Sequence, residues 1–150
     1  MSPAAMLGAH HAFHEWVEVP PYHVAVHDAR DGIVWDDSGA EPRTVRSVLV
    51  EYANYTDAPL SYRLAQWMLY DTEGYAYEAE LRTALYAAEA LRRLKEGVTL
   101  TGQSVKGWVA FEVPDQARLA YLQFRPGYLP TASLAFASMA LALLEHAPSQ

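Results

Sequence analysis

The amino-acid sequence predicts a mainly β protein, an antiparallel β-sandwich with one crossover helix and a C-terminal helix. Apolar residues alternate with polar ones over several short segments, turn-forming residues separate these segments, and a single segment among them has a helical period. The 150 residues, with a hydrophobic content of 51%, suit one core. We divide the chain into an N-terminal segment (1–20), the sandwich (21–128) and a C-terminal helix and tail (129–150).

The first strand is expected directly after the N-terminal segment. At 22–27 the sequence YHVAVH alternates, which predicts a strand that carries His23 and His27 on its outward face. The next stretch, Asp28–Pro42, is rich in Asp and Gly. We therefore expect a loop there, enclosing at most one short strand at Ile33–Trp35.

The central strand is predicted within Val45–Pro59, which ends in a polar turn that begins at Asn54. Its inward stripe is Val48, Val50 and Tyr52. The aromatic segment Tyr62–Tyr70 predicts the next strand and closes at the turn residues Asp71–Gly74. We expect these two strands to pair with each other.

A helical period then replaces the alternation. In Glu78–Glu96, leucine and alanine recur at three- and four-residue steps, and Gly97 follows as a cap, which predicts the crossover helix. Alternation returns in Val105–Val113, and Leu119–Phe124 predicts the last strand. The inward stripe of the former is Val109, Phe111 and Val113. Both inward stripes must lie between two stacked sheets if the sandwich prediction is right.

The C-terminal segment is uncharged and strongly apolar. A helix over Ala132–Leu144 would be about 20 Å long against a hydrocarbon core of roughly 30 Å, so no membrane span is expected. We expect this helix to cover apolar surface on the sandwich or on a second copy of the chain. The predicted partner-binding residues are its large apolar side chains, Leu134, Phe136, Met139 and Leu143.

Three stretches resemble a bacterial family of immunoglobulin-like domains, domain of unknown function 4352. They are LVEYANYTDAPL, MLYDTEGYAY and GVTLTGQSVKGWVAFEVPDQARLAYLQF. The family pattern is matched by the strand that ends at Asn54, by the acidic hairpin Asp71–Gly74, and by Gly107, Phe111 and Pro114. The family is similar in fold to the mycobacterial immunoprotective secreted antigen. The resemblance implies an immunoglobulin-like sandwich without a shared active site, and a fold alone does not supply a function.

Charge and composition limit the classes of partner and of site that we expect. Eighteen acidic residues against 11 basic ones give a net charge of -7, which repels phosphate backbones, so no nucleic-acid partner is expected. The absence of cysteine removes disulfides, thiolate nucleophiles and cysteine zinc sites. The first residues do not resemble a secretory signal, which predicts a cytoplasmic location, or an extracytoplasmic one if the start was trimmed.

Histidines near the start are candidate metal ligands. His10 and His14 would lie one turn apart on a helix, with His11 beside them, a spacing at which imidazoles share Zn²⁺, Ni²⁺ or Cu²⁺. A solvated terminus is the alternative. His23 and His27 would lie about 13 Å apart along a strand, too far to share an ion, although one of them could join the N-terminal group in space.

Two other groups also have alternative interpretations. Four aspartates of the predicted loop could bind Ca²⁺ or simply solvate a turn: Asp28, Asp31, Asp36 and Asp37. The 10 tyrosines are expected mostly to fill the core, and those left on a sheet face would form a protein-binding patch.

No Ser–His–Asp order, phosphate loop or paired-carboxylate motif stands out, so we predict no catalytic residue and no cofactor. The predicted function is that of a non-enzymatic binding or assembly module, with a protein partner or with itself as a homo-oligomer. The alternative is a His-dependent metal-binding or sensing domain built on His10, His11 and His14.

Overall fold

The computed structural model describes residues 13–34, 43–79, 94–114, 116–127 and 134–136. Its elements in chain order are β1 (Val17–Val19), β2 (Tyr22–Val34), β3 (Arg43–Ala53), β4 (Leu60–Tyr62), the 3-10 helix η1 (Leu64–Gln66), β5 (Trp67–Asp71), β6 (Ala76–Glu78), β7 (Gly97–Thr99), β8 (Ser104–Glu112), β9 (Leu119–Phe124) and β10 (Leu134–Phe136).

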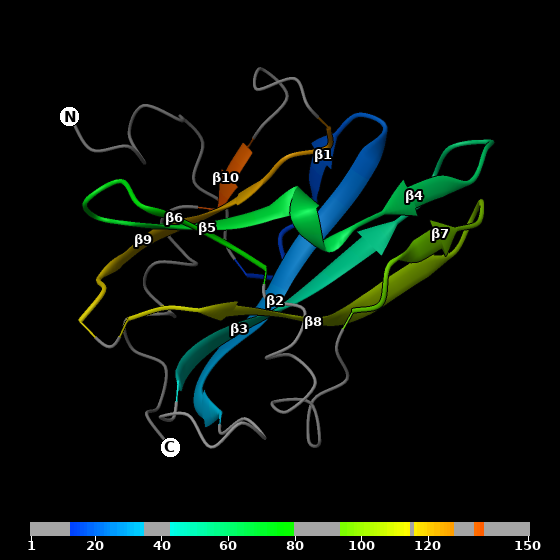
Figure 1. Cartoon of the computed structure of the whole chain (residues 1–150). Helices are drawn as coiled ribbons and strands as arrows, with labels where there is room; N and C mark the ends of the chain where they lie inside the picture. Colours follow the sequence, from blue (N-terminus) through cyan, green and yellow to red (C-terminus); the bar gives the residue numbers. More distant parts are fainter. Residues whose placement is uncertain (1–12, 35–42, 80–93, 115, 128–133, 137–150) are drawn as a thin grey trace.

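Two four-stranded sheets face each other (Figure 1). The first sheet has the order β1-β2-β3-β8 and the second sheet the order β10-β9-β5-β6, with every neighbouring pair antiparallel. β4 and β7 form a separate antiparallel ribbon, which we name the β4–β7 ribbon, at the right-hand end in Figure 1. A bridge between Ala79 and Phe111 links the end of β6 to β8. The chain is therefore an antiparallel β-sandwich.

Both predicted inward stripes lie between the two sheets and are buried, which confirms the burial pattern on which the sandwich prediction depends. In β3 and β8 every second side chain points inward, because successive residues of a strand face opposite sides. The stripes join one apolar cluster with side chains of the second sheet: Trp67, Leu69, Leu122 and Phe124. Burying each of these large side chains contributes about 1.5–3 kcal/mol.

A buried hydrogen-bond network links the two sheets through the core. The hydroxyl of Tyr52 donates to Oε1 of Gln66 at 2.7 Å and accepts from Nε1 of Trp67 at 2.8 Å. Gln66 also accepts from the backbone N–H of Arg63 at 3.0 Å and donates to the carbonyl of Pro126 at 3.1 Å. Burial raises the pKa of the Tyr52 hydroxyl, which stays neutral. Because these polar atoms have partners, burying them costs little.

Asn54 directly follows β3 and anchors the turn that the sequence predicts there. Its side-chain amide donates to the carbonyls of Ala58 and Thr99, at 2.8 Å in each case. Its side-chain oxygen accepts from the backbone N–H of Thr56 at 2.9 Å and from the Thr56 hydroxyl at 2.7 Å. This buried residue therefore fixes the turn after β3 against the end of β7.

Asp71 organises the predicted hairpin turn between β5 and β6. Its Oδ1 accepts from the backbone N–H groups of Glu73 and Tyr75, both at 2.9 Å, and its Oδ2 accepts from the Tyr77 hydroxyl at 2.8 Å. Burial acts to raise the pKa of Asp71, but the hydrogen bonds from Tyr77, Tyr75, Glu73 and Gly74 outweigh it and lower this pKa. Burial and the neighbouring Asp71 carboxylate raise the pKa of Tyr77 to about 12.

The pairing predicted for the two central segments is wrong. β3 pairs with β2 and β8, whereas β5 pairs with β6 and β9 in the other sheet. The segment Tyr62–Tyr70 is not one strand either, because β4 ends at Tyr62 and η1 separates it from β5. Alternation marks which face of a strand is buried, but it does not encode which strand lies beside it.

The loop expected at Asp28–Pro42 is wrong over its first half, because β2 continues to Val34. The ladder with β3 runs from Asp28 opposite Leu49 to Val34 opposite Arg43. The long neighbouring strand β3 supplies partners for the backbone N–H and C=O groups on the side of β2 that faces it, and this outweighs the low strand propensity of Asp and Gly. Residues 35–42 lie outside the described residues.

Neither predicted helix is supported. At the two ends of the expected crossover helix, Glu78 belongs to β6 and residues 94–96 have no regular structure, while 80–93 lie outside the described residues. The C-terminal helix is wrong at Leu134–Phe136, which form β10 and pair with β9, Leu134 opposite Phe124. Pairing with β9 satisfies backbone groups that a helix would have satisfied internally, so tertiary context overrides helical propensity. Met139 and Leu143 lie outside the described residues.

Candidate functional site

Three side chains form a hydrogen-bonded row on the outer face of the first sheet. The Nδ1 atoms of His14 and His27 lie 2.7 Å apart, and Nε2 of His27 lies 2.7 Å from Oε1 of Glu51. His14 is exposed, whereas His27 and Glu51 are partly buried. The ring of Trp16, also exposed, stands edge-on to His27 with 6.2 Å between the ring centroids. We name this group the His14–His27–Glu51 row.

A bulge in β2 and a loop before β1 bring the row together. The register between β2 and β3 shifts between Val26 and Asp28, so His27 is the extra residue, and bulges of this kind re-aim a side chain. The backbone N–H of His14 donates to the carbonyl of Val26 at 2.8 Å. His14 has a φ of 68°, a left-handed conformation that is uncommon for residues with a Cβ. The backbone thus holds His14 beside His27.

Glu51 determines the protonation pattern of the row. An ionised carboxylate only accepts hydrogen bonds, so Nε2 of His27 must donate to it. In neutral imidazole the other nitrogen of His27 then carries a lone pair, and it accepts from Nδ1 of His14. These proton positions are assigned from the partners. One proton is therefore shared between two imidazole nitrogens that point at each other.

The structure pairs His14 with His27. The sequence analysis grouped His14 with His10 and His11, which lie outside the described residues, and allowed one strand histidine to join the group in space. His27 is that histidine. Over the described part of the chain, no three His, Asp or Glu side chains are arranged to hold a metal ion.

His23 faces outward from the same strand but takes no part in the row. Its Nε2 lies 3.8 Å from Glu18, and its ring stands edge-on to Tyr55 at 4.7 Å between centroids. His23 and His27 therefore contact different side chains and do not share a site.

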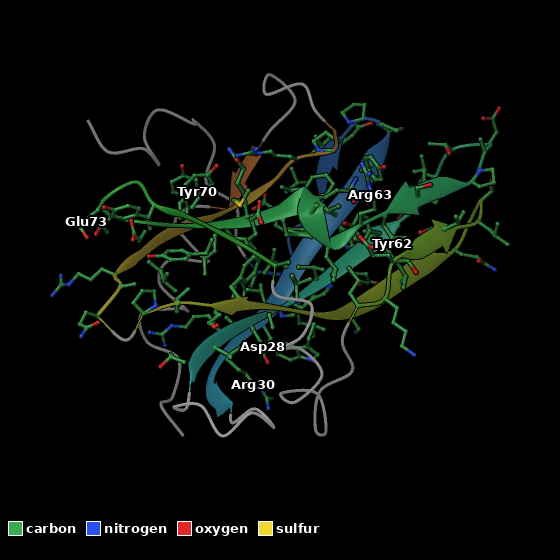
Figure 2. The ribbon with its side chains drawn as sticks, in the orientation of Figure 1. Asp28, Arg30, Tyr62, Arg63, Tyr70 and Glu73 are labelled. Atoms are coloured by element: carbon green, nitrogen blue, oxygen red, sulfur yellow. The ribbon has the colours of Figure 1, made fainter. Side chains whose placement is uncertain are left out.

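Of the predicted aspartate group, Asp28 and Asp31 lie in β2 and not in a loop. Oδ1 of Asp28 accepts from the backbone N–H of Ala29 at 2.8 Å, and its Oδ2 lies 3.4 Å from Nε of Arg30. The Arg30 guanidinium lies over the Trp108 ring, 5.6 Å from its centroid. Figure 2 shows Asp28 and Arg30 on the side of the first sheet that faces away from the second. Asp31 also belongs to β2, and Asp36 and Asp37 lie outside the described residues.

A second candidate surface lies on the β4–β7 ribbon. Val98 is 54% exposed and Leu100, two residues further on, is 51% exposed. Val98 pairs with the exposed Ser61, whereas Leu60 and Thr99 face inward. Val98 therefore points to the outer side of the ribbon, and the exposed Leu100 follows directly after β7. We name these two residues the ribbon surface.

The tyrosines divide largely as expected between core and surface. Tyr52, Tyr62 and Tyr121 are buried, while Tyr55 is 70% exposed and Tyr75 is 65% exposed. Tyr55 follows β3 near the ribbon, and Tyr75 follows the β5–β6 turn, and these two places lie at opposite ends of the sandwich (Figure 1). The two exposed tyrosines among the described residues therefore do not form one patch.

The outer face of the second sheet carries a polar aromatic cluster. The rings of Tyr70 and Tyr121 are stacked, with centroids 4.7 Å apart and an interplanar angle of 14°. Nη2 of Arg125 donates to the Tyr70 hydroxyl, and Nε of Arg125 donates to Oε1 of Gln123 at 2.9 Å. Figure 2 shows Tyr70 in the upper part of the sandwich, where the second sheet lies. These side chains therefore contact one another across the outer face of the sheet.

Two hollows lined by described residues adjoin Met68 of β5, which belongs to the second sheet. One has a volume of about 230 Å³ and extends to Leu64 and Glu96, and the other has a volume of about 270 Å³ and extends to Arg63 and Arg125. Both are smaller than the roughly 300–1,000 Å³ of typical small-molecule sites.

Sequence reasoning missed Glu51, Val98 and Leu100. A signal existed for the ribbon surface, since Gly97–Thr101 alternates apolar residues with Gly and Thr. No local signal marks Glu51, because the bulge at His27 decides which side chain of β3 lies beside that ring.

No family model and no curated protein matches the chain. Among solved structures, the chain is similar to the yjhA protein from Bacillus subtilis, with 17% identity, a TM-score of 0.60, and coverage of 77% of this chain and 82% of that one. It is similar to the secreted protein MPT63 from Mycobacterium tuberculosis, with 9% identity, a TM-score of 0.61, and coverage of 86% and 96%. It is also similar to a functionally unknown protein from Listeria monocytogenes, with 8% identity, a TM-score of 0.61, and coverage of 83% and 81%.

These similarities concern the fold. The resemblance to the mycobacterial secreted antigen is confirmed at that level, while no family model supports domain of unknown function 4352. The described residues include no helix with the length and apolar character needed to cross a bilayer. The chain thus shares an antiparallel sandwich with bacterial proteins that include one secreted protein and one of unknown function.

Proposed function

We propose that this chain is a non-enzymatic protein-binding module with an immunoglobulin-like sandwich, and that it binds its partner through the ribbon surface. The observation that supports the proposal is the exposure of Val98 on the outer side of the β4–β7 ribbon, at 54%, and of Leu100 directly after β7, at 51%. Paired apolar side chains in water gain free energy when a partner covers them, at about 25 cal/mol per Å² of buried apolar area.

The ribbon is suited to recognition because the core holds it rigidly. Asn54 ties the turn before β4 to the end of β7, and the Tyr22 hydroxyl donates to the carbonyl of Ser61 at 2.7 Å. Tyr62 packs on Tyr52 with 5.3 Å between ring centroids. A surface that is already ordered loses little conformational entropy on binding, so more of the contact energy remains as affinity.

We propose a partner protein whose binding face is apolar and neutral or basic. The chain carries a net charge of -7, so two copies repel each other, whereas a basic partner is attracted. Self-association through the ribbon surface is an outcome that the experiment distinguishes. The sequence analysis also predicted self-association, but through the C-terminal residues Leu134, Phe136, Met139 and Leu143. The proposal assigns no catalytic residue and no cofactor, and the cytoplasmic location stays a prediction.

The test compares three baits prepared from the full chain: the native protein, a Val98→Ser/Leu100→Ser double variant, and a Tyr75→Ser control. Tyr75 is also exposed but belongs to the connection between β5 and β6, which lies at the end of the sandwich away from the ribbon in Figure 1. Each bait is crosslinked in extracts of the encoding organism, and each retained protein is then purified and tested for direct binding by sedimentation velocity.

A partner that binds the native and control baits, and binds the double variant at least about tenfold more weakly, supports the proposal. Concentration-dependent dimers of the native chain that the double variant abolishes would replace the heterologous partner with a second copy. Equal binding of all three baits to every retained protein would overturn the role of the ribbon surface.

A further inference from the structure

We propose that His14 and His27 form a binding site for a divalent transition-metal ion of the imidazole-preferring class, Cu²⁺, Ni²⁺ or Zn²⁺, with Glu51 positioning the ring of His27. This inference does not depend on the protein-binding role of the ribbon surface. It differs from the sequence-based prediction in its ligands, because His27 of β2 takes the place that the prediction gave to His10 and His11 beside His14.

The two ligand atoms already converge. Nδ1 of His14 and Nδ1 of His27 lie 2.7 Å apart, and their ring centroids are 4.8 Å apart. In the other tautomer of neutral His14 the hydrogen lies on Nε2, so both Nδ1 atoms then present lone pairs to the space between the rings, and a cation there takes the place of the hydrogen-bonding proton. Neutral imidazole nitrogen is a preferred ligand of Zn²⁺, Cu²⁺ and Ni²⁺.

The separation of the nitrogens favours a particular coordination geometry. With metal–nitrogen bonds of about 2.0 Å, two ligand nitrogens lie about 2.8 Å apart at a right angle and about 3.3 Å apart at a tetrahedral angle. The observed 2.7 Å is close to the right-angle value, so the two nitrogens need to separate little to occupy adjacent corners of a tetragonal site, once each ring has turned to direct its lone pair at the ion and not at the other ring. Tetragonal sites suit Cu²⁺ and Ni²⁺, and Cu²⁺ binds nitrogen ligands most tightly among these ions. We therefore expect the affinity order Cu²⁺ > Ni²⁺ ≥ Zn²⁺.

Glu51 gives His27 the properties of a metal ligand. A carboxylate that accepts from the far nitrogen of a ligating imidazole fixes its tautomer, orients the ring and raises its basicity. Here Oε1 of Glu51 accepts from Nε2 of His27 at 2.7 Å, which leaves Nδ1 as the nitrogen with the lone pair. Glu51 is thus a positioning residue.

The backbone prearranges the second ligand. His14 is held to Val26 by a 2.8 Å backbone hydrogen bond and adopts a φ of 68°. Backbone strain of this kind is often found at ligand sites. Water completes the coordination in this proposal.

The experiment measures binding of CuCl₂, NiCl₂ and ZnCl₂ to the untagged full chain by competition with a chelator of known affinity. The variants are His14→Gly, His27→Gln and Glu51→Gln, with His23→Gln as the matched control. Glycine accepts the positive φ at position 14, so this variant removes the ring while keeping the backbone conformation. Melting curves confirm that each variant is folded, and His14→Gly carries the test if His27→Gln is not.

We expect one Cu²⁺ per native chain, at least about tenfold weaker binding for His14→Gly and His27→Gln, and about 10–100-fold weaker binding for Glu51→Gln. Electron paramagnetic resonance of the Cu²⁺ complex should show nitrogen ligands that the His14→Gly variant reduces in number. The His23→Gln control should bind like the native chain.

Three results would overturn the proposal: no stoichiometric ion on the native chain, native affinity in His27→Gln, or equal loss of affinity in the His23→Gln control. Native affinity in His27→Gln together with loss in His14→Gly would place the ion on the N-terminal histidines alone. Because the Val98→Ser/Leu100→Ser variant leaves these ligands intact, it should bind Cu²⁺ normally whatever becomes of its protein partner.

Discussion

The indole N–H of Trp67 on β5 donates a 2.8 Å hydrogen bond to the hydroxyl of Tyr52 on β3, and it thereby joins the two sheets inside the core. The same hydroxyl donates to Gln66, so one oxygen satisfies two buried partners. A hydroxyl deep in an apolar core is tolerated because it completes this network, and its removal leaves polar groups without partners.

Tyr52→Phe is expected to lower the free energy of unfolding by about 2 kcal/mol, because Nε1 of Trp67 loses its buried acceptor. Urea unfolding followed by tryptophan fluorescence measures the change. Tyr55→Phe removes a hydroxyl from an exposed ring and serves as the control, with no change expected. An equal stability of Tyr52→Phe and the native chain would show that water satisfies the indole.

Acidification is expected to weaken the β5–β6 turn through Asp71. The pKa of Asp71 is lowered in the folded state, so its contribution is present above its ordinary pKa of about 3.9 and is lost as the pH falls through the folded value. The stability of the native chain should therefore decline below about pH 4 more steeply than that of Asp71→Asn. Thermal melts at pH 7, 5, 4 and 3 measure both curves, and parallel curves would contradict the assignment.

Asn54→Ala is expected to lower the free energy of unfolding by about 2–3 kcal/mol, because the carbonyl of Thr99 loses its side-chain donor and the turn after β3 loses its anchor. Asn54→Asp keeps an oxygen for Thr56 but lacks the donor and places a buried carboxylate against the carbonyls of Ala58 and Thr99, so it should cost at least as much as Asn54→Ala. Asp57→Ala in the same turn is exposed and should leave stability unchanged. Chemical unfolding ranks the three variants, and a neutral Asn54→Ala would refute the anchoring role.

Gly74→Ala is expected to cost about 1 kcal/mol. Gly74 has a φ of 92°, and a Cβ there would meet nothing within 4 Å, so the cost arises from the backbone conformation alone. Gly127→Ala also enters open space, without a positive φ, and should be neutral. Differential scanning calorimetry compares the two, and equal melting temperatures would show that the turn relaxes to accept the side chain.

Short-range sequence patterns predicted which face of each strand is buried and where the turns lie, but they did not predict which strands pair. The stripes of β3 and β8 and the turns at Asn54 and Asp71 follow from side-chain period and turn chemistry, which act over a few residues. The extension of β2 through Asp28 and Gly32 did not follow, because it depends on β3 lying alongside. The same reason applies to β10. The sequence predicts its residues as part of a helix, but they form a strand because β9 provides a partner.

The candidate sites show the same division. The sequence by itself determined that a two-layer core exists, which side chains enter it, and that histidines near the start are candidate ligands. Only the tertiary structure decided that His14 meets His27 and that Glu51 lies behind it, because the contact joins residues 13 and 24 positions apart through a bulge and a left-handed backbone. Side-chain periodicity is a property of one strand, whereas a site is a property of the register between strands, and register is set by the packing of the whole sandwich.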